Sequence, residues 1–207
     1  MKSNAKDSQP VDRRTVLKSF LTIGAGISLS ALMPERAISG ILNSPVKRNE
    51  LRPPGALPES DFIATCIRCG RCAEVCPYYS IEPISLKGGL QAGTPLIHVE
   101  HIACYLCMEC VKVCPTGALQ NVPAEKAGMG LARIDEERCW AYNGKALCRA
   151  CYDACPFKNV AIQLIHLKPV IVEDKCVGCG LCVAACPVQI PRAVNVDPLE
   201  DHLKRSG

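Results

Sequence analysis

Three stretches of the chain alternate apolar and polar residues with the two-residue period of a β-strand, and each is followed by a second apolar stretch. The pairs are residues 160–167 with 170–172, residues 118–122 with 131–134, and residues 81–86 with 96–99. Each pair is joined by a segment that contains Pro or Gly, which favours a turn. The pattern therefore predicts three antiparallel strand pairs.

The composition is rich in cysteine and poor in aromatic residues, which suggests that the cysteines organise the fold. The 207 residues include sixteen cysteines, sixteen prolines and fifteen glycines, but only three Phe, one Trp and five Tyr. So few rings cannot fill a large core, and the Pro and Gly content predicts many loops. The net charge is +4, and no basic patch is interleaved with aromatic residues, so we expect no nucleic-acid partner.

All sixteen cysteines fall into four motifs, each ending in Cys-Pro, and these motifs carry the candidate chemistry. Three of them have the spacing C-x2-C-x2-C-x3-C-P, whereas one has eight residues between its first two cysteines. In chain order the four sets are Cys66, Cys69, Cys72 and Cys76; Cys104, Cys107, Cys110 and Cys114; Cys139, Cys148, Cys151 and Cys155; and Cys176, Cys179, Cys182 and Cys186. This is the spacing of bacterial 4Fe–4S sites, in which three thiolates bind one cluster and the fourth binds a second.

Two other uses of cysteine fit the spacing poorly. Zinc sites use two separated pairs of cysteines rather than three within seven residues, and cysteines this close in sequence seldom meet disulfide geometry. Sixteen ligands in four motifs predict four 4Fe–4S clusters. The insert between Cys139 and Cys148 leaves one alternative open, a less firmly held or oxygen-sensitive 3Fe–4S form at the third motif.

Residues 1–39 resemble a twin-arginine export signal. Arg13 and Arg14 precede an apolar run at 20–32, whose thirteen residues are fewer than the roughly 18 that a membrane span needs. Ala37 and Ser39 are small residues placed for cleavage. An ordinary Sec signal or a buried N-terminal helix are the alternatives. The twin-arginine route moves folded proteins, so this signal predicts a periplasmic protein whose cofactor is inserted before export by the Tat machinery. The cleavage site stays open, and the signal could remain attached as an anchor.

The expected fold class is α+β, with tandem units like the bacterial dicluster ferredoxin: short helices and small antiparallel sheets around four clusters. Four segments are expected. They are the signal at 1–39, a Pro-rich linker at 40–60, the four-cluster domain of two dicluster units at 61–192, and a polar tail at 193–207. Tyr78 and Tyr79 are expected to pack over the cluster of the first motif.

The pairing of the motifs is left open by their separation. Between successive motifs lie 27, 24 and 20 residues, and all three lengths suit a ferredoxin linker. Sequential pairing joins the first motif with the second and the third with the fourth. The chain also broadly resembles iron–sulfur subunits of bacterial membrane-linked oxidoreductases, in which the second motif pairs with the third and the first with the fourth. We favour this nested pairing.

A more specific resemblance comes from residues 51–57, the first motif with the flanking Phe62 and Tyr78, residues 93–95 and 113–119, and residues 129–131 before the long third motif. With the export signal, nearly the whole chain is similar to the NapG/MauM ferredoxin-type proteins. The resemblance implies a periplasmic relay that takes electrons from a membrane quinol-oxidising protein. It would pass them towards a terminal reductase or cytochrome, in a nitrate-reductase-type or a methylamine-utilisation-type pathway. The compact second motif departs from the nitrate-linked branch, where a longer gap before its third cysteine is expected.

No residue pattern indicates a catalytic site, because no cysteine is left over and no acid–base or nucleophile arrangement is present. We therefore expect an electron carrier and not an enzyme. The alternative is a permanent iron–sulfur subunit of a membrane-linked oxidoreductase complex whose catalytic site lies on another chain.

Overall fold

Each cysteine motif contains a short helix that carries its third cysteine. The computed structural model describes residues 51–188 and 191–199. These helices are α4 (Arg71–Glu74), α5 (Glu109–Lys112), α6 (Ala150–Ala154) and α7 (Leu181–Ala184). Each motif then ends in Cys-Pro, and proline cannot supply the N–H that a continuing helix needs. A longer helix, α3 (Glu59–Thr65), precedes the first motif.

The described strands form three two-stranded antiparallel sheets. They pair β1 (Glu82–Pro83) with β2 (Pro95–Leu96), β4 (Ile162–Ile165) with β5 (Lys168–Ile171), and β3 (Gly130–Ile134) with β6 (Val194–Pro198). Short helices with small antiparallel sheets confirm the expected α+β class. The first two pairs also confirm two of the three expected strand pairs.

The third expected strand pair, residues 118–122 with 131–134, is wrong. β3 pairs instead with β6 near the end of the described chain. Leu119 bridges Ala56 in antiparallel fashion, and the N–H of Gln120 donates to the Gly55 carbonyl over 2.7 Å. The prediction paired residues 131–134 with residues 118–122 because the two are close in sequence. Residues 119–120 contact residues 55–56 instead.

Both ends of the described chain are part of the folded body, which corrects the expected boundaries. Leu51, Pro53 and Pro54 lie in the expected linker but are almost fully buried. Val194 and Val196 lie in the expected polar tail, yet they are buried in β6 at 3% and 1% exposure. The expected export signal, with Arg13 and Arg14, lies outside the described residues.

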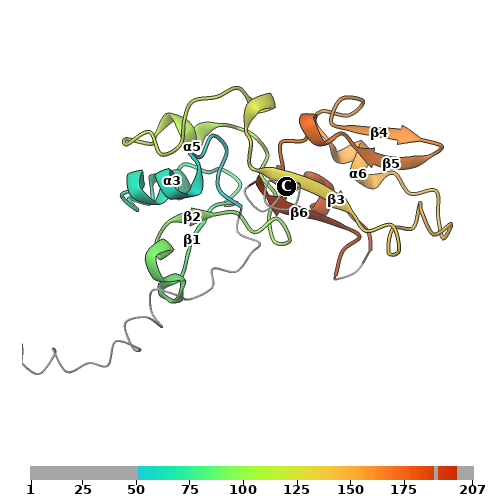
Figure 1. The fold of residues 1–207 in the computed structure, drawn as a ribbon, viewed down its shortest axis with the longest axis horizontal. Helices are drawn as coiled ribbons and strands as arrows, with labels where there is room; N and C mark the ends of the chain where they lie inside the picture. The colour runs from blue at the N-terminus through green and yellow to red at the C-terminus, as the bar shows by residue number, and fades with distance from the viewer. Residues whose placement is uncertain (1–50, 189–190, 200–207) are drawn as a thin grey trace, which may run out of the picture. The chain divides into compact units, whose positions relative to one another are not determined.

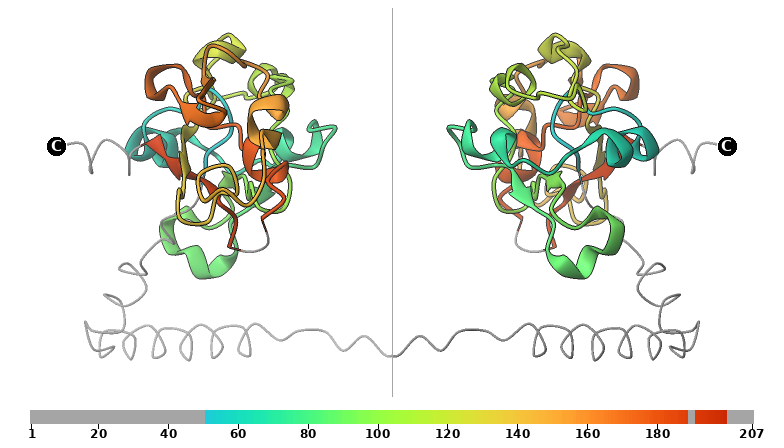
Figure 2. Two further views of the ribbon diagram at one scale, coloured as in Figure 1. Left: turned by 90° about the vertical axis from the view of Figure 1, so that its right-hand side faces the viewer. Right: turned by 90° about the vertical axis from the view of Figure 1, so that its left-hand side faces the viewer.

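The motifs sort into two halves, residues 51–119 and residues 130–199, joined by a segment containing η3 (Ala124–Lys126). In the first half α4 packs on α5, and in the second α6 packs on α7. Figure 1 shows α3, α5, β1 and β2 on one side and α6, β4 and β5 on the other. Both views in Figure 2 show η2 (Leu86–Gln91) projecting from the body. Among the described helices, none is long and apolar enough to cross a membrane.

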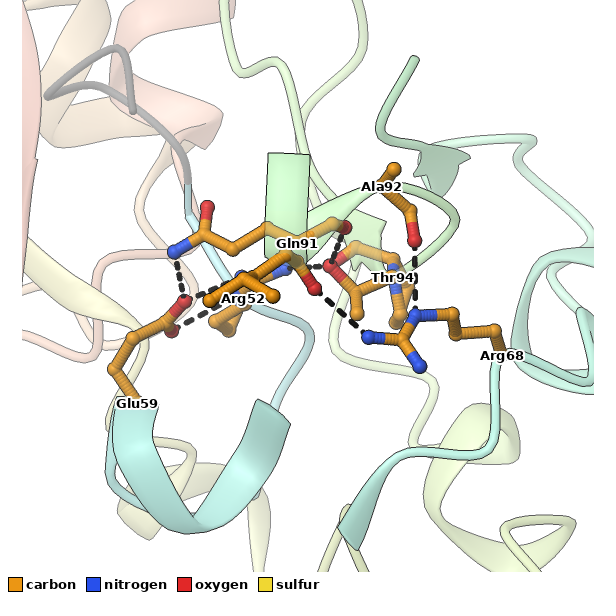
Figure 3. Close-up of polar contacts among 8 residues, drawn as sticks. Arg52, Glu59, Arg68, Gln91, Ala92 and Thr94 are labelled. Carbon is orange, nitrogen blue, oxygen red and sulfur yellow. Dashed lines mark hydrogen bonds and ion pairs between the residues drawn. The ribbon is translucent and has the colours of Figure 1, made fainter. Parts of the chain in front are cut away.

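A buried arginine ties the start of the described chain to the first motif (Figure 3). Arg52 donates through Nε to Glu59 at 2.9 Å and through Nη1 to the Thr94 hydroxyl at 2.9 Å, and it lies over the Phe62 ring. Gln91 donates to the same Glu59 carboxylate at 2.7 Å. The arginine thus joins α3 to the segment after η2, on which the first motif rests.

The same segment holds the loop of the first motif directly. Arg68, between the first two cysteines, donates to the carbonyls of Ala92 and Leu90 over 2.9 and 2.8 Å. Figure 3 shows the Ala92 contact beside the Arg52 network. The first cysteine loop is therefore positioned by contacts on both sides of residues 90–95.

Replacing Arg52 is expected to destabilise the protein. Arg52→Ala would remove the charged hydrogen bonds from the guanidinium to the Glu59 carboxylate, 25% exposed, and to the buried Thr94 hydroxyl, at a cost of about 1–3 kcal/mol. Lys112→Ala is the control, because it removes a short ion pair, 2.7 Å to Glu109, that is open to solvent. Thermal unfolding of the iron-loaded proteins should show a lower midpoint for Arg52→Ala and no measurable change for Lys112→Ala. Equal midpoints would contradict the structural role of Arg52.

Candidate metal centre

Three cavities in the described chain are each lined by four cysteines, three from one motif and the last from another. In the order in which they are described next, their empty volumes, which include space open to solvent, are about 560, 300 and 380 Å³. The first is lined by Cys66, Cys69, Cys72 and Cys114; the second by Cys104, Cys107, Cys110 and Cys76; the third by Cys176, Cys179, Cys182 and Cys155. Each cavity therefore brings cysteines of two motifs to one site.

The other four cysteines belong to the same two motifs as the third cavity. Cys139 and Cys148 lie close enough to Cys151 for their charges to affect its ionisation. Cys186 is buried at the end of α7, which packs on α6. The second half therefore contains all eight cysteines of the third and fourth motifs.

These groups show that the favoured nested pairing is wrong and that the motifs pair sequentially. Cys114 of the second motif joins the first motif, and Cys76 of the first joins the second. The reason lies in the path of the segments that connect successive motifs, because the lengths of these segments do not distinguish sequential from nested pairing. The β1–β2 and β4–β5 hairpins turn the chain back on itself, so each motif meets the one that follows its hairpin.

The loops of the first, second and fourth motifs share one backbone path around the second cysteine. Before that cysteine φ is positive, at 58°, 55° and 73° for Arg68, Leu106 and Gly178. After it φ is again positive, at 77°, 59° and 81° for Gly70, Met108 and Gly180. In the third motif, the residue after the second cysteine is Arg149, and its φ is −136°. The backbone of the motif with the long insert therefore follows a different path here.

This path suits a site for a negatively charged group. Turns through the left-handed region direct successive backbone N–H groups into a concavity that binds anions. A non-glycine residue in that region costs roughly 1–2 kcal/mol, and three of the six positions are not glycine. Strain of this kind persists where the surroundings enforce it, most often at functional sites.

Burial raises the pKa of several of these thiols and so favours their neutral form in the absence of a metal. Burial, followed by the charges of neighbouring cysteines, raises the pKa of Cys110 and of Cys151 to about 12. It also raises the pKa of Cys179 to about 12 and that of Cys104 to about 11. A cation must therefore displace the protons before these sulfurs can act as thiolate ligands.

Some cysteine sulfurs already receive hydrogen bonds from the backbone. The N–H of Leu119 donates to the sulfur of Cys114, and the N–H of Ala132 donates to that of Cys176, both over 3.4 Å. Burial opposes ionisation of Cys114, but this bond and those from Thr116 outweigh it and lower its pKa. Such bonds to sulfur are among the means by which proteins tune iron–sulfur clusters.

The described residues include every cysteine, and no three His, Cys, Asp or Glu side chains among them converge closely enough to hold a single metal ion. A zinc ion would draw its ligands to about 2.3 Å from one point. What the cysteines line instead are the larger four-cysteine cavities. These suit a cluster whose irons each take one thiolate.

Two tyrosines cover the second cavity, which sequence reasoning did not find. The rings of Tyr78 and Tyr105 stack with centroids 4.2 Å apart, and both residues line the cavity with Cys76 and Cys104. The expectation that Tyr78 and Tyr79 pack over the cluster of the first motif is therefore wrong. Tyr78 reaches the second cavity instead, and Tyr79 is 76% exposed.

Comparison with known families identifies the kind of domain. The model of the 4Fe-4S dicluster domain matches residues 65–118, 103–159 and 146–190. The first match contains the first and second motifs, the middle one the second and third, and the last one the fourth motif with all of the third except Cys139. The chain thus carries tandem dicluster domains.

Similar proteins extend the match beyond the cysteine motifs. The chain is 35% identical to the methylamine utilization ferredoxin-type protein MauM of Methylorubrum extorquens, over 98% of this chain and 96% of the relative. It is 39% identical to the ferredoxin-type protein NapG of Escherichia coli, over 72% and 71%. It is also 36% identical to MauM of Paracoccus denitrificans, over 78% and 74%. The chain therefore belongs to the MauM and NapG ferredoxin-type proteins, which makes it an iron–sulfur electron-transfer protein with 4Fe–4S clusters.

Proposed function

We propose that this chain holds four 4Fe–4S clusters and relays electrons in the periplasm, without a catalytic site of its own. The observation that carries the proposal is the set of cavities lined by three cysteines of one motif and the fourth of its partner. That arrangement gives each cube the four thiolates it needs. Bound there, a cluster takes up and gives back one electron.

The ligands follow from the cavities for three clusters and from elimination for the fourth. Three clusters would be held by the cysteine groups of the three cavities described above. The fourth would take Cys139, Cys148 and Cys151 with the buried Cys186, the cysteines that remain in the second half. The eight-residue loop between Cys139 and Cys148 would then join two ligands of the same cluster.

Other residues of the chain would set how each cluster is used. The stacked rings of Tyr78 and Tyr105 would limit water at the second cluster, because aromatic cover lowers the local polarity. Cys69 is the most exposed of the sixteen cysteines, all of which the structure describes, and Ile67, two residues before it, is 62% exposed. The first cluster would therefore be the one most open to a redox partner.

The family supports a proposal for the partners of the relay. We infer a membrane quinol-oxidising protein as donor and a terminal reductase or cytochrome as acceptor. The MauM relatives carry methylamine utilization in their names, and the resemblance to NapG points towards nitrate reduction. Export through the twin-arginine route would deliver the protein already loaded. Association with the membrane through a partner or an uncleaved signal is compatible with this role.

Export can be tested on the arginine pair. With Arg13 and Arg14 intact, iron-loaded protein is expected in the periplasmic extract of anaerobically grown cells. Arg13→Lys/Arg14→Lys keeps both charges but should leave the loaded protein in the cytoplasm, as measured by iron content and antibody detection in each fraction. Loaded protein in the periplasm of the lysine variant would overturn the proposed route.

The relay can be tested with purified, oxidised protein under anaerobic conditions. Membranes from the host, supplied with quinol, are expected to bleach the visible absorbance of the clusters, whereas membranes without quinol are not. Periplasmic extract from cells grown on methylamine or on nitrate should restore the absorbance, and the active extract identifies the pathway. Failure of quinol-charged membranes to reduce the free protein, together with its recovery only inside a larger complex, would favour the permanent-subunit alternative.

A further inference from the structure

The two halves of the protein touch at a point where two cysteine motifs meet directly. The N–H of Cys104, the first cysteine of the second motif, donates to the carbonyl of Cys179 over 2.9 Å. Cys179 is the second cysteine of the fourth motif. The hydrogen bond therefore links a residue that lines the second cavity to one that lines the third.

Close packing on both sides of this hydrogen bond fixes it in place. A Cβ built on Gly180 would lie 2.3 Å from Cγ1 and 2.6 Å from Cβ of Val99, a buried residue. A Cβ on Gly178 would lie 2.4 Å from the backbone nitrogen of Gly130. The N–H of Met129 donates to the Val177 carbonyl over 3.0 Å. The fourth-motif loop can approach this closely only because it has glycine at both positions.

Within each half, packed helices hold the two motifs together. The third cysteines of the motifs, Cys72 with Cys110 and Cys151 with Cys182, lie on the packed helix pairs α4–α5 and α6–α7. The two cysteine sites of each half therefore lie side by side, and the Cys104–Cys179 contact connects one half to the other.

We propose that electrons pass between the two halves at the Cys104–Cys179 contact, which we call the crossing, and that this contact places the four clusters in one linear order. The order runs from the site of Cys66, Cys69, Cys72 and Cys114, through that of Cys76, Cys104, Cys107 and Cys110 and that of Cys155, Cys176, Cys179 and Cys182, to that of Cys139, Cys148, Cys151 and Cys186. Val99 and Gly180 are positioning residues for the crossing. At the crossing one cluster is oxidised by one electron as its neighbour is reduced by one, and no ligand bond changes. The proposal rests on the four-cluster function proposed above.

The crossing can be tested on two glycines in equivalent positions. Gly180→Ala forces a methyl group against Val99, whereas Gly70→Ala places one at the same position of the first motif, where nothing lies within 4 Å. The two glycines have φ of 81° and 77°, so both variants carry the same backbone strain. Hydrogen exchange at the Cys104 amide is the readout. It is expected to be slow in the wild type and in Gly70→Ala and faster in Gly180→Ala.

A second variant, on the other side of the contact, keeps the test valid if Gly180→Ala loses clusters. Val99→Leu enlarges the side chain that faces Gly180 and changes no motif residue. It is expected to speed exchange at Cys104 in the same way. Unchanged protection at Cys104 in both Gly180→Ala and Val99→Leu would overturn the crossing.

Electron paramagnetic resonance tests the order of the clusters. Cys69→Ala/Cys148→Ala removes the outer two sites, and the reduced inner pair is expected to give a spectrum broadened by magnetic interaction. Cys107→Ala/Cys182→Ala removes the inner two, and the outer pair should give the sum of two isolated signals. The reverse result would overturn the order. If iron analysis of the wild type shows fewer than four clusters, the proposed function fails, whereas the Cys104 amide still reports on the contact itself.

Discussion

The grouping of four cysteines from two motifs around one cavity is the constraint on which the rest of this structure depends. Eight of the sixteen cysteines are buried in the hydrophobic core, and burial raises the pKa of several of them to about 11 or 12. Where burial raises the pKa, it favours the neutral thiol over the thiolate. Iron bound at these sulfurs would replace their protons and join segments that have few rings to pack, so metal binding and folding would be coupled.

The chain around the sites is arranged to hold the cysteine loops at fixed points. In the first half, residues 51–57 and the buried Arg52 fasten α3 and the segment after η2 beneath the first motif (Figure 3). In the second half, β6 completes a sheet with β3, and the backbone beside β3 contacts the fourth-motif loop. Segments at both ends of the described chain thus support the loops that carry the function.

The sequence predicted the candidate sites better than it predicted their pairing. Motif spacing identified all the cysteines that line the cavities, because three cysteines within seven residues can reach one cube without help from the rest of the fold. It could not choose between sequential and nested pairing, since linker length is similar in all three gaps. The direction in which each hairpin returns the chain made that choice, and it depends on tertiary packing.

Other features escaped sequence reasoning for related reasons. β6 is separated from β3 by the third and fourth motifs, so no local pattern linked Val196 to Ala132, and its polar flanks resembled a tail. The contact of Arg52 with Glu59 and Thr94 joins three separate segments. The family resemblance did include residues 51–57 and 93–95, and that shared agreement was the one available sign of a structural role.

Iron and acid-labile sulfide per chain, measured on double cysteine variants, test the sequentially paired four-cluster arrangement most directly. At four irons per cube, about sixteen of each are expected in the wild type. Cys69→Ala/Cys114→Ala should lose one cluster, leaving about twelve, because both residues line the same cavity. Cys69→Ala/Cys186→Ala should lose two, leaving about eight irons. If Cys69→Ala/Cys114→Ala lost two clusters and Cys69→Ala/Cys186→Ala lost one, the pairing would be nested. Zinc, or fewer than about sixteen irons in the wild type, would contradict the four-cluster arrangement.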